Sequence, residues 1–87
     1  MEYTLYGTRM CSREDAQLHI AEVFSFPDWY GRNLDALFDL LTAWTEPAVI
    51  HLLDGAEMDA ALGAYARGLR RVFADAAAQN PNLTLRF

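Results

Sequence analysis

The chain has 87 residues, 53% of them hydrophobic, with one cysteine and a formal net charge of −5. This composition excludes intrinsic disorder and an internal disulfide bond, and it can supply the core of a single small domain spanning residues 1–87. There is no long uncharged apolar run and no basic N-terminal start, so we expect a cytoplasmic protein without a membrane span or signal peptide.

The acidic residues are concentrated in the middle of the chain. Residues 14–59 contain ten acids and one base, Arg32, whereas residues 1–13 and 60–87 are each slightly basic. A negative field of this kind argues against direct binding to nucleic acid or to an anionic membrane, and it favours a basic partner. From composition alone the simpler account is that the acids keep a hydrophobic small protein soluble.

A strand and a helix are expected first in the chain. Residues Glu2–Tyr6 alternate between two faces, which predicts a strand. Ser12, followed three residues later by Asp15, is typical of a helix start. The apolar side of that helix recurs at helical spacing and consists of Ala16, Ile20, Val23 and Phe24. Pro27 cannot continue the helix, because proline lacks the backbone donor and disfavours helical geometry in the residue before it.

A second helix, a second strand and a further helical region follow. Asn33 is a suitable N-cap for a helix from Leu34 to about Trp44. The apolar run 48–53 has the length of a strand that is covered on at least one face. Residues 56–79 are rich in alanine and predict helix.

Glycines and a turn divide the C-terminal third of the chain. Gly63 and Gly68 predict a break within the helical region. The turn Asn80-Pro81-Asn82 leads into another alternating strand, Leu83–Phe87. Long helical connections between consecutive strands imply parallel pairing with right-handed crossovers. We therefore predict an α/β fold of two layers, in which a three-stranded parallel sheet packs against helices.

The predicted second helix has one apolar face and one mixed face. Successive residues of a helix turn by roughly 100°, which divides this segment into two arcs. The arc expected to face the core contains Leu34, Leu37, Leu40, Leu41 and Trp44. The opposite arc carries Asp35, Phe38, Asp39, Thr42 and Ala43.

The mixed arc is a candidate binding surface. Asp35 and Asp39 lie one turn apart on it, and no base at helical spacing neutralises them. Phe38 beside them is a large apolar side chain on an arc where we expect no burial. With Trp29 just upstream, these residues could contact a partner. A solvated helix face with one stray aromatic explains the pattern equally well, so the geometry leaves both interpretations open.

Residues 29–42 resemble the signature of a known family. They read Trp-Tyr-Gly-Arg-Asn-Leu-Asp-Ala-Leu-Phe-Asp-Leu-Leu-Thr. An aromatic pair, glycine, any residue, then Asn-Leu-Asp-Ala-Leu, an aromatic and Asp is a specific string. It is similar to that of the barstar family, the intracellular protein inhibitors of secreted microbial ribonucleases. The resemblance extends over nearly the whole chain without gaps, and it implies the same two-layer α/β fold.

The resemblance also implies roles for individual residues. In that family the corresponding helix plugs the ribonuclease active site, with its acids where the RNA phosphates would sit, and here those acids are Asp35 and Asp39. Trp29 would cover the catalytic groups of the enzyme. A further acid on the long C-terminal helix corresponds to Asp75. The rim of the contact would be formed by Asn33, Phe38, Thr42, Ala43 and Trp44.

This chain departs from the family prototype at three of these positions. Trp29 replaces a tyrosine, Phe38 replaces a tryptophan and loses its indole donor, and Asp75 replaces a longer glutamate. Such changes indicate an adapted partner surface. The implied function is inhibition of a basic, guanyl-type ribonuclease in a 1:1 complex, with no catalytic residues, cofactor or metal. The alternative is an immunity or antitoxin protein of the same fold against a different basic toxin.

Other chemistry has weaker support. Asp35 with Asp39 as a general acid–base pair would need two differently tuned environments. His19 and His51 have no metal-ligand partner at a recognised spacing, and we expect both to be structural. Cys11 lacks a positioned histidine and is expected to be a lone thiol. Arg67, Arg70 and Arg71 cluster on the last helix and are expected to form a solvated face that could also pair with acids.

Overall fold

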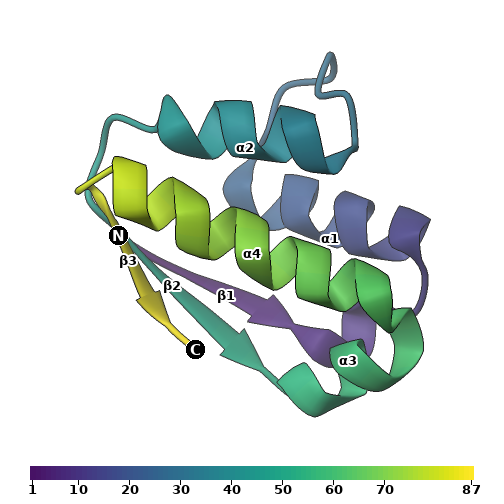
Figure 1. Cartoon of the computed structure of the whole chain (residues 1–87). Coiled ribbons are helices and arrows are strands. Elements are labelled where there is room, and N and C mark those ends of the chain that lie inside the picture. Colours follow the sequence, from purple (N-terminus) through teal and green to yellow (C-terminus); the bar gives the residue numbers. More distant parts are fainter.

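The computed structural model describes residues 1–87, in which strands alternate with helices (Figure 1). The strands are β1 (Glu2–Tyr6), β2 (Ala48–Leu53) and β3 (Leu83–Arg86). The helices are α1 (Arg13–Phe24), α2 (Leu34–Thr42), α3 (Gly55–Leu62) and α4 (Ala64–Gln79), with a short 3-10 turn at Gly7–Arg9.

The three strands form one parallel sheet in the order β1-β2-β3, which confirms the predicted fold class. The register aligns Tyr3 with Ile50 and Ile50 with Leu85, a row that packs toward the helices. Side chains alternate between the two faces of a strand, so Thr4 and its neighbour His51 point to the opposite face. Helices α1, α2 and α4 lie on the same side of the sheet (Figure 1).

The core lies between the sheet and these helices. Its fully buried side chains come from both layers and include Leu5, Ile20, Leu37, Leu41 and Ile50. Removing an aliphatic side chain of this size from water stabilises the folded state by roughly 1.5–3 kcal/mol. Two of these residues belong to α2, so its inner side is fixed to the core while its outer side remains free.

A glycine sets the close approach of α2 to α4. Gly68 lies within α4, and a methyl group added there would be 3.0 Å from Cδ1 of Leu34. The predicted break at Gly68 is therefore wrong: the helix continues through this residue, and the missing side chain makes room for α2. The break lies at Gly63 alone, where a φ of 55° requires the backbone freedom of glycine.

The predicted helix starts are confirmed in atomic detail. Ser12 Oγ accepts a hydrogen bond from the Asp15 backbone N–H at 3.1 Å, and Asn33 caps α2 in the same way. α2 ends at Thr42, two residues before the expected end.

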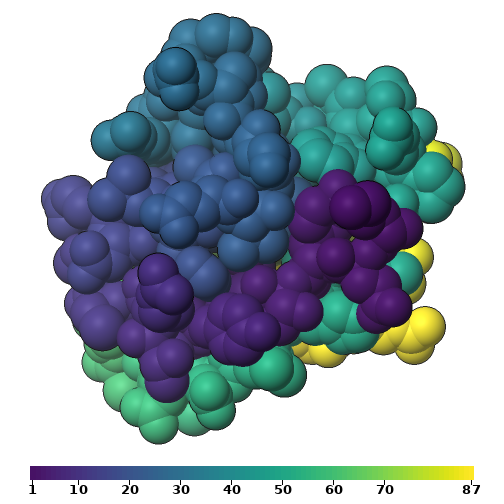
Figure 2. Space-filling view, turned by 180° about the vertical axis from the view of Figure 1, so that it is seen from behind, coloured from purple at the N-terminus to yellow at the C-terminus, as the bar shows by residue number.

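The segment that joins α1 to α2 projects from one end of the molecule, as the view from behind also shows (Figure 2). None of the helices combines the length and the apolar character needed to cross a membrane.

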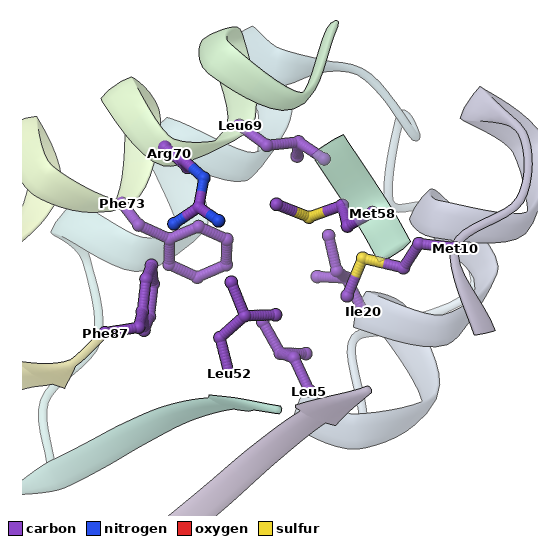
Figure 3. A pocket seen from close by; sticks show the side chains of 9 residues that line it. All are labelled: Leu5, Met10, Ile20, Leu52, Met58, Leu69, Arg70, Phe73 and Phe87. Carbon is purple, nitrogen blue, oxygen red and sulfur yellow. The ribbon is translucent and has the colours of Figure 1, made fainter. Parts of the chain in front are cut away.

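A small apolar cavity lies where α3 and α4 meet the sheet (Figure 3). Its volume is about 10 Å³, which is the space of one water molecule. It is lined by Leu5, Met10, Ile20, Leu52, Met58, Leu69, Arg70, Phe73 and Phe87. Its size and lining make it a packing gap in the core, and it offers no room for a substrate.

Candidate partner-binding surface

The start of α2 is held by a turn around Asn33. The Asn33 Oδ1 accepts a hydrogen bond from the Ala36 N–H at 2.8 Å, and its Nδ2 donates to the Gly31 carbonyl at 3.3 Å. Arg32 has a φ of 53°, a left-handed conformation that costs a residue with a side chain about 1 kcal/mol. This turn fixes where the helix begins and therefore where its first acid lies.

Asp35 and Asp39 are both exposed on α2, as the helical wheel predicts. Asp35 lies in the first turn, where a carboxylate interacts favourably with the helix dipole. Neither carboxylate has a cation of this chain within salt-bridge distance. Neither lines a hollow of the surface. The two negative charges thus stand on an open, rigid face and are neutralised by nothing nearby.

The other outer residues of α2 are less exposed than expected. Phe38 is partly buried and packs against the core cluster, so the expectation that burial does not explain it is wrong. A helix lying on the rim of a small core buries part of its flanks as well as its inner face. Thr42 is also partly buried, and its hydroxyl donates to the carbonyls of Phe38 and Asp39 at 2.8 and 3.2 Å. Ala43 is exposed just after the helix.

Trp29, in the loop just before α2, has a highly exposed apolar side chain. It is 76% exposed, whereas its neighbour Tyr30 is 5% exposed. Burial, and secondarily Tyr65, raise the pKa of Tyr30 above its ordinary value, so its hydroxyl stays protonated and can donate a hydrogen bond. A large exposed indole a few residues before two exposed carboxylates is a typical composition for a protein-binding surface.

Trp44 belongs to the packing of the fold as much as to the surface. Its ring meets Tyr3 and Phe24 edge to face, with centroids 5.6 and 5.7 Å apart. Its Nε1 is buried and has no hydrogen-bond partner. A contact between Trp44 and a partner remains a prediction.

Asp75 is exposed on α4 and lies 3.4 Å from Arg71, one turn earlier in the same helix. It therefore belongs to a different helix from Asp35 and Asp39 and differs from them in having a cation beside it. Its contribution to a contact also remains a prediction.

The remaining candidates have local roles. The Nε2 of His19 accepts a hydrogen bond from the Tyr6 N–H at 2.9 Å, and burial lowers the pKa of this histidine. His51 lies 2.6 Å from Glu2 across the sheet. Cys11 is exposed and contacts only the Thr8 carbonyl, at 3.5 Å. No three His, Cys, Asp or Glu side chains come together in a way that could hold a metal ion.

A model of the family described as Barstar (barnase inhibitor) matches residues 1–87. The chain belongs to the barstar family. One relative, the protein named "Putative ribonuclease inhibitor YrdF" of Bacillus subtilis (strain 168), is 40% identical over 58 residues. The aligned region covers 66% of this chain and 64% of the relative, so the match spans less than two thirds of the relative's length.

Two buried polar residues that bond to the segments on either side of α2 were not predicted from the sequence of this barstar-family protein. Gln17, on α1, bonds to Tyr30 and Tyr65. Asn80, after α4, donates through Nδ2 to the Leu41 carbonyl at 2.9 Å and to the Trp44 carbonyl at 2.8 Å. The signal for Gln17 is a polar residue beside the apolar stripe of α1, whereas the turn pattern Asn80-Pro81-Asn82 accounts for Asn80 without a tertiary role.

Proposed function

We propose that this protein inhibits a ribonuclease by placing α2 in the active site of the enzyme. The observation that carries the proposal is the pair of exposed carboxylates, Asp35 and Asp39, with no cation of their own chain nearby. Family membership and the name of the Bacillus subtilis relative support the same activity.

The proposed mechanism follows from the charge of the two surfaces. A ribonuclease active site collects arginine, lysine and histidine to hold phosphates, and α2 would offer carboxylates to those donors. Charge-assisted hydrogen bonds between arginine and carboxylate are strong when water is excluded. The net charge of −5 would also steer the encounter with a basic enzyme.

Each surface residue has a proposed part in this complex. Asp35 and Asp39 occupy the phosphate positions, and Trp29 covers the catalytic groups with its exposed ring. Asp75 makes a weaker contact from α4, because Arg71 already partly compensates its charge. The rim is formed by Asn33, Phe38, Thr42, Ala43 and Trp44. The partner we propose is a secreted, guanyl-type microbial endoribonuclease, bound 1:1 in the cytoplasm of the cell that makes it.

The open position of the two acids favours binding over catalysis. A general acid–base pair needs one carboxyl in an environment that raises its pKa and one in an environment that does not. Asp35 and Asp39 instead lie on the same exposed helix face, outside every hollow of the surface. We therefore propose no enzymatic activity.

The test is a titration of the protein into guanyl-specific microbial ribonucleases while RNA cleavage is followed. We expect cleavage to stop at one equivalent for the matching enzyme, and a double variant, Asp35→Ala with Asp39→Ala, to inhibit far less. A protein that leaves every such enzyme active but is captured by another basic toxin would be an immunity protein. That result would contradict the proposed target.

A further inference from the structure

The segment before α2 sends two neighbouring aromatic side chains in opposite directions. Trp29 is 76% exposed and Tyr30 is 5% exposed. A turn produces this reversal, because the Tyr30 N–H donates to the Pro27 carbonyl at 2.9 Å. The rings of Tyr30 and Phe26 lie 4.8 Å apart, which adds an apolar contact on the inner side. Tyr30 is therefore the internal anchor of a loop that presents Trp29.

The Tyr30 hydroxyl takes part in a chain of two hydrogen bonds. Tyr30 donates to Oε1 of Gln17, and Nε2 of Gln17 donates to the Tyr65 hydroxyl at 2.8 Å. These residues come from the loop, from α1 and from α4 respectively. Gln17 is only 2% exposed, so it cannot itself touch a partner protein.

Gln17 is an unusual choice for its position if packing were its only task. It is fully buried in α1, between Ala16 and Ile20, which are both completely buried. An amide in such a place is unfavourable unless its polar atoms are paired, and here the two tyrosines pair both of them. An apolar side chain could fill the same space. It could not, however, accept the hydrogen bond from the Tyr30 hydroxyl that ties the loop to α1.

We propose that Gln17 is a positioning residue for partner recognition. By holding the Tyr30 hydroxyl it fixes the direction in which Trp29 leaves the surface. The part of this inference that concerns binding rests on the proposed function. The fixing of the loop is a property of the free protein and can be measured without a partner.

The binding test compares two variants with a matched control. Gln17→Met keeps the length of the side chain without the amide, and Tyr30→Phe removes only the hydroxyl. Ile50→Val is the control, because it trims a fully buried core residue in β2, on a different element from the loop. We expect the first two variants to raise the inhibition constant about tenfold while the control leaves it unchanged.

The same measurements in a Trp29→Ala background separate positioning from general destabilisation. If Gln17 acts through Trp29, the effect of Gln17→Met should fall to about twofold or less once the indole is gone. An inhibition constant that Gln17→Met leaves unchanged would overturn the inference. So would a loss of the same size with and without Trp29.

Amide hydrogen exchange in the free protein gives an independent readout. We expect residues 28–33 to exchange faster in Gln17→Met and Tyr30→Phe than in Ile50→Val when the variants are compared at equal global stability. Exchange rates in this segment that equal those of Ile50→Val would overturn the inference. If Gln17→Met fails to fold, Tyr30→Phe alone decides, because it removes the same hydrogen bond. A wild-type protein that inhibits no ribonuclease would contradict the proposed function and leave this result to decide the role of Gln17.

Discussion

The fold treats the two acids of α2 differently from Asp59 of α3 and Asp75 of α4. Asp59 of α3 accepts two hydrogen bonds from the Arg70 guanidinium, both at 3.0 Å, and Asp75 of α4 has Arg71 beside it. Asp35 and Asp39 have no such cation, and as like charges one turn apart they cost α2 a few tenths of a kcal/mol. Asp35 and Asp39 are therefore free to meet the cations of another protein.

The largest loss of inhibition is expected when the two acids of α2 are removed. Asp39→Ala and Asp35→Ala should each weaken inhibition by ~2 kcal/mol or more, because truncation leaves cations of the partner buried without a counter-charge. Both variants should remain folded, since both side chains point away from the core. The measurement is the inhibition constant of each variant beside its thermal unfolding curve. Full inhibition by both folded variants would show that α2 is not the plug.

Salt tests whether the unpaired charge acts at long range. Between low and high ionic strength we expect the association rate to fall roughly tenfold, while the dissociation rate changes much less. Salt ions screen the long-range electrostatic attraction between the two proteins and so slow their association. They have much less effect on charge pairs from which water is excluded. Stopped-flow mixing at several salt concentrations gives the association rate. An association rate independent of salt would remove the steering argument and leave the contact argument standing.

Asp75, unlike Asp35 and Asp39, has an arginine of its own chain beside it, and its removal should weaken inhibition less. We expect Asp75→Ala to cost less inhibition than either α2 variant, because Arg71 already shares its charge. Asp75→Glu should leave binding to the matching ribonuclease unchanged or weaker, and it should improve binding to the ribonuclease of the family prototype. Inhibition constants against both enzymes test this. A loss from Asp75→Ala as large as that from Asp39→Ala would mean that both helices carry the contact equally.

The smallest effect should come from the best-paired acid, and it should appear in stability. Arg70 lowers the pKa of Asp59, chiefly through its hydrogen bonds to the carboxylate. The folded-state pKa lies below the unfolded value of 3.8, so the stabilisation is present above that pH and is lost as the pH falls through the folded-state pKa.

Urea unfolding of the wild type and of Asp59→Asn measures this contribution. The wild type should be slightly more stable at about pH 6, and the difference should shrink as the pH is lowered below 3.8. A difference that stays constant across this range would mean that Asp59 and Arg70 do not act as an ion pair. Inhibition at neutral pH should be the same for both proteins.

Local signals in the sequence were sufficient for the fold and for the outline of the surface. Alternation predicted β1 and β3, and a short apolar run predicted β2. The caps at Ser12 and Asn33 predicted where two helices begin, because these signals act within a few residues. The wheel correctly placed Asp35 and Asp39 outside. It could not place Phe38, because the burial of a helix flank depends on the neighbouring elements.

The missing parts are those that depend on distant residues. Gln17 lies 48 residues before Tyr65, and no period or motif announces a hydrogen bond over that separation. Gly68 was predicted to interrupt a helix, since the local rule for glycine is the same whether the residue breaks a helix or admits another one. In both cases the residue makes a tertiary contact with a distant part of the chain. The residues next to it in the sequence do not predict that contact.

The bonds from Asn80 to the end of α2 have a consequence for the order in which the protein becomes active during synthesis. Asn80 donates to the carbonyl of Leu41, which leaves the ribosome 39 residues earlier. The last turn of α2 therefore waits for its hydrogen-bond donor until residue 80 has been made, and β3 follows directly afterwards. A nascent chain that stops before residue 80 carries the acids of α2 on a helix whose C-terminal end is not yet tied down. The C-terminal end of α2, and with it the proposed binding surface, is thus fixed only after residue 80 has been made.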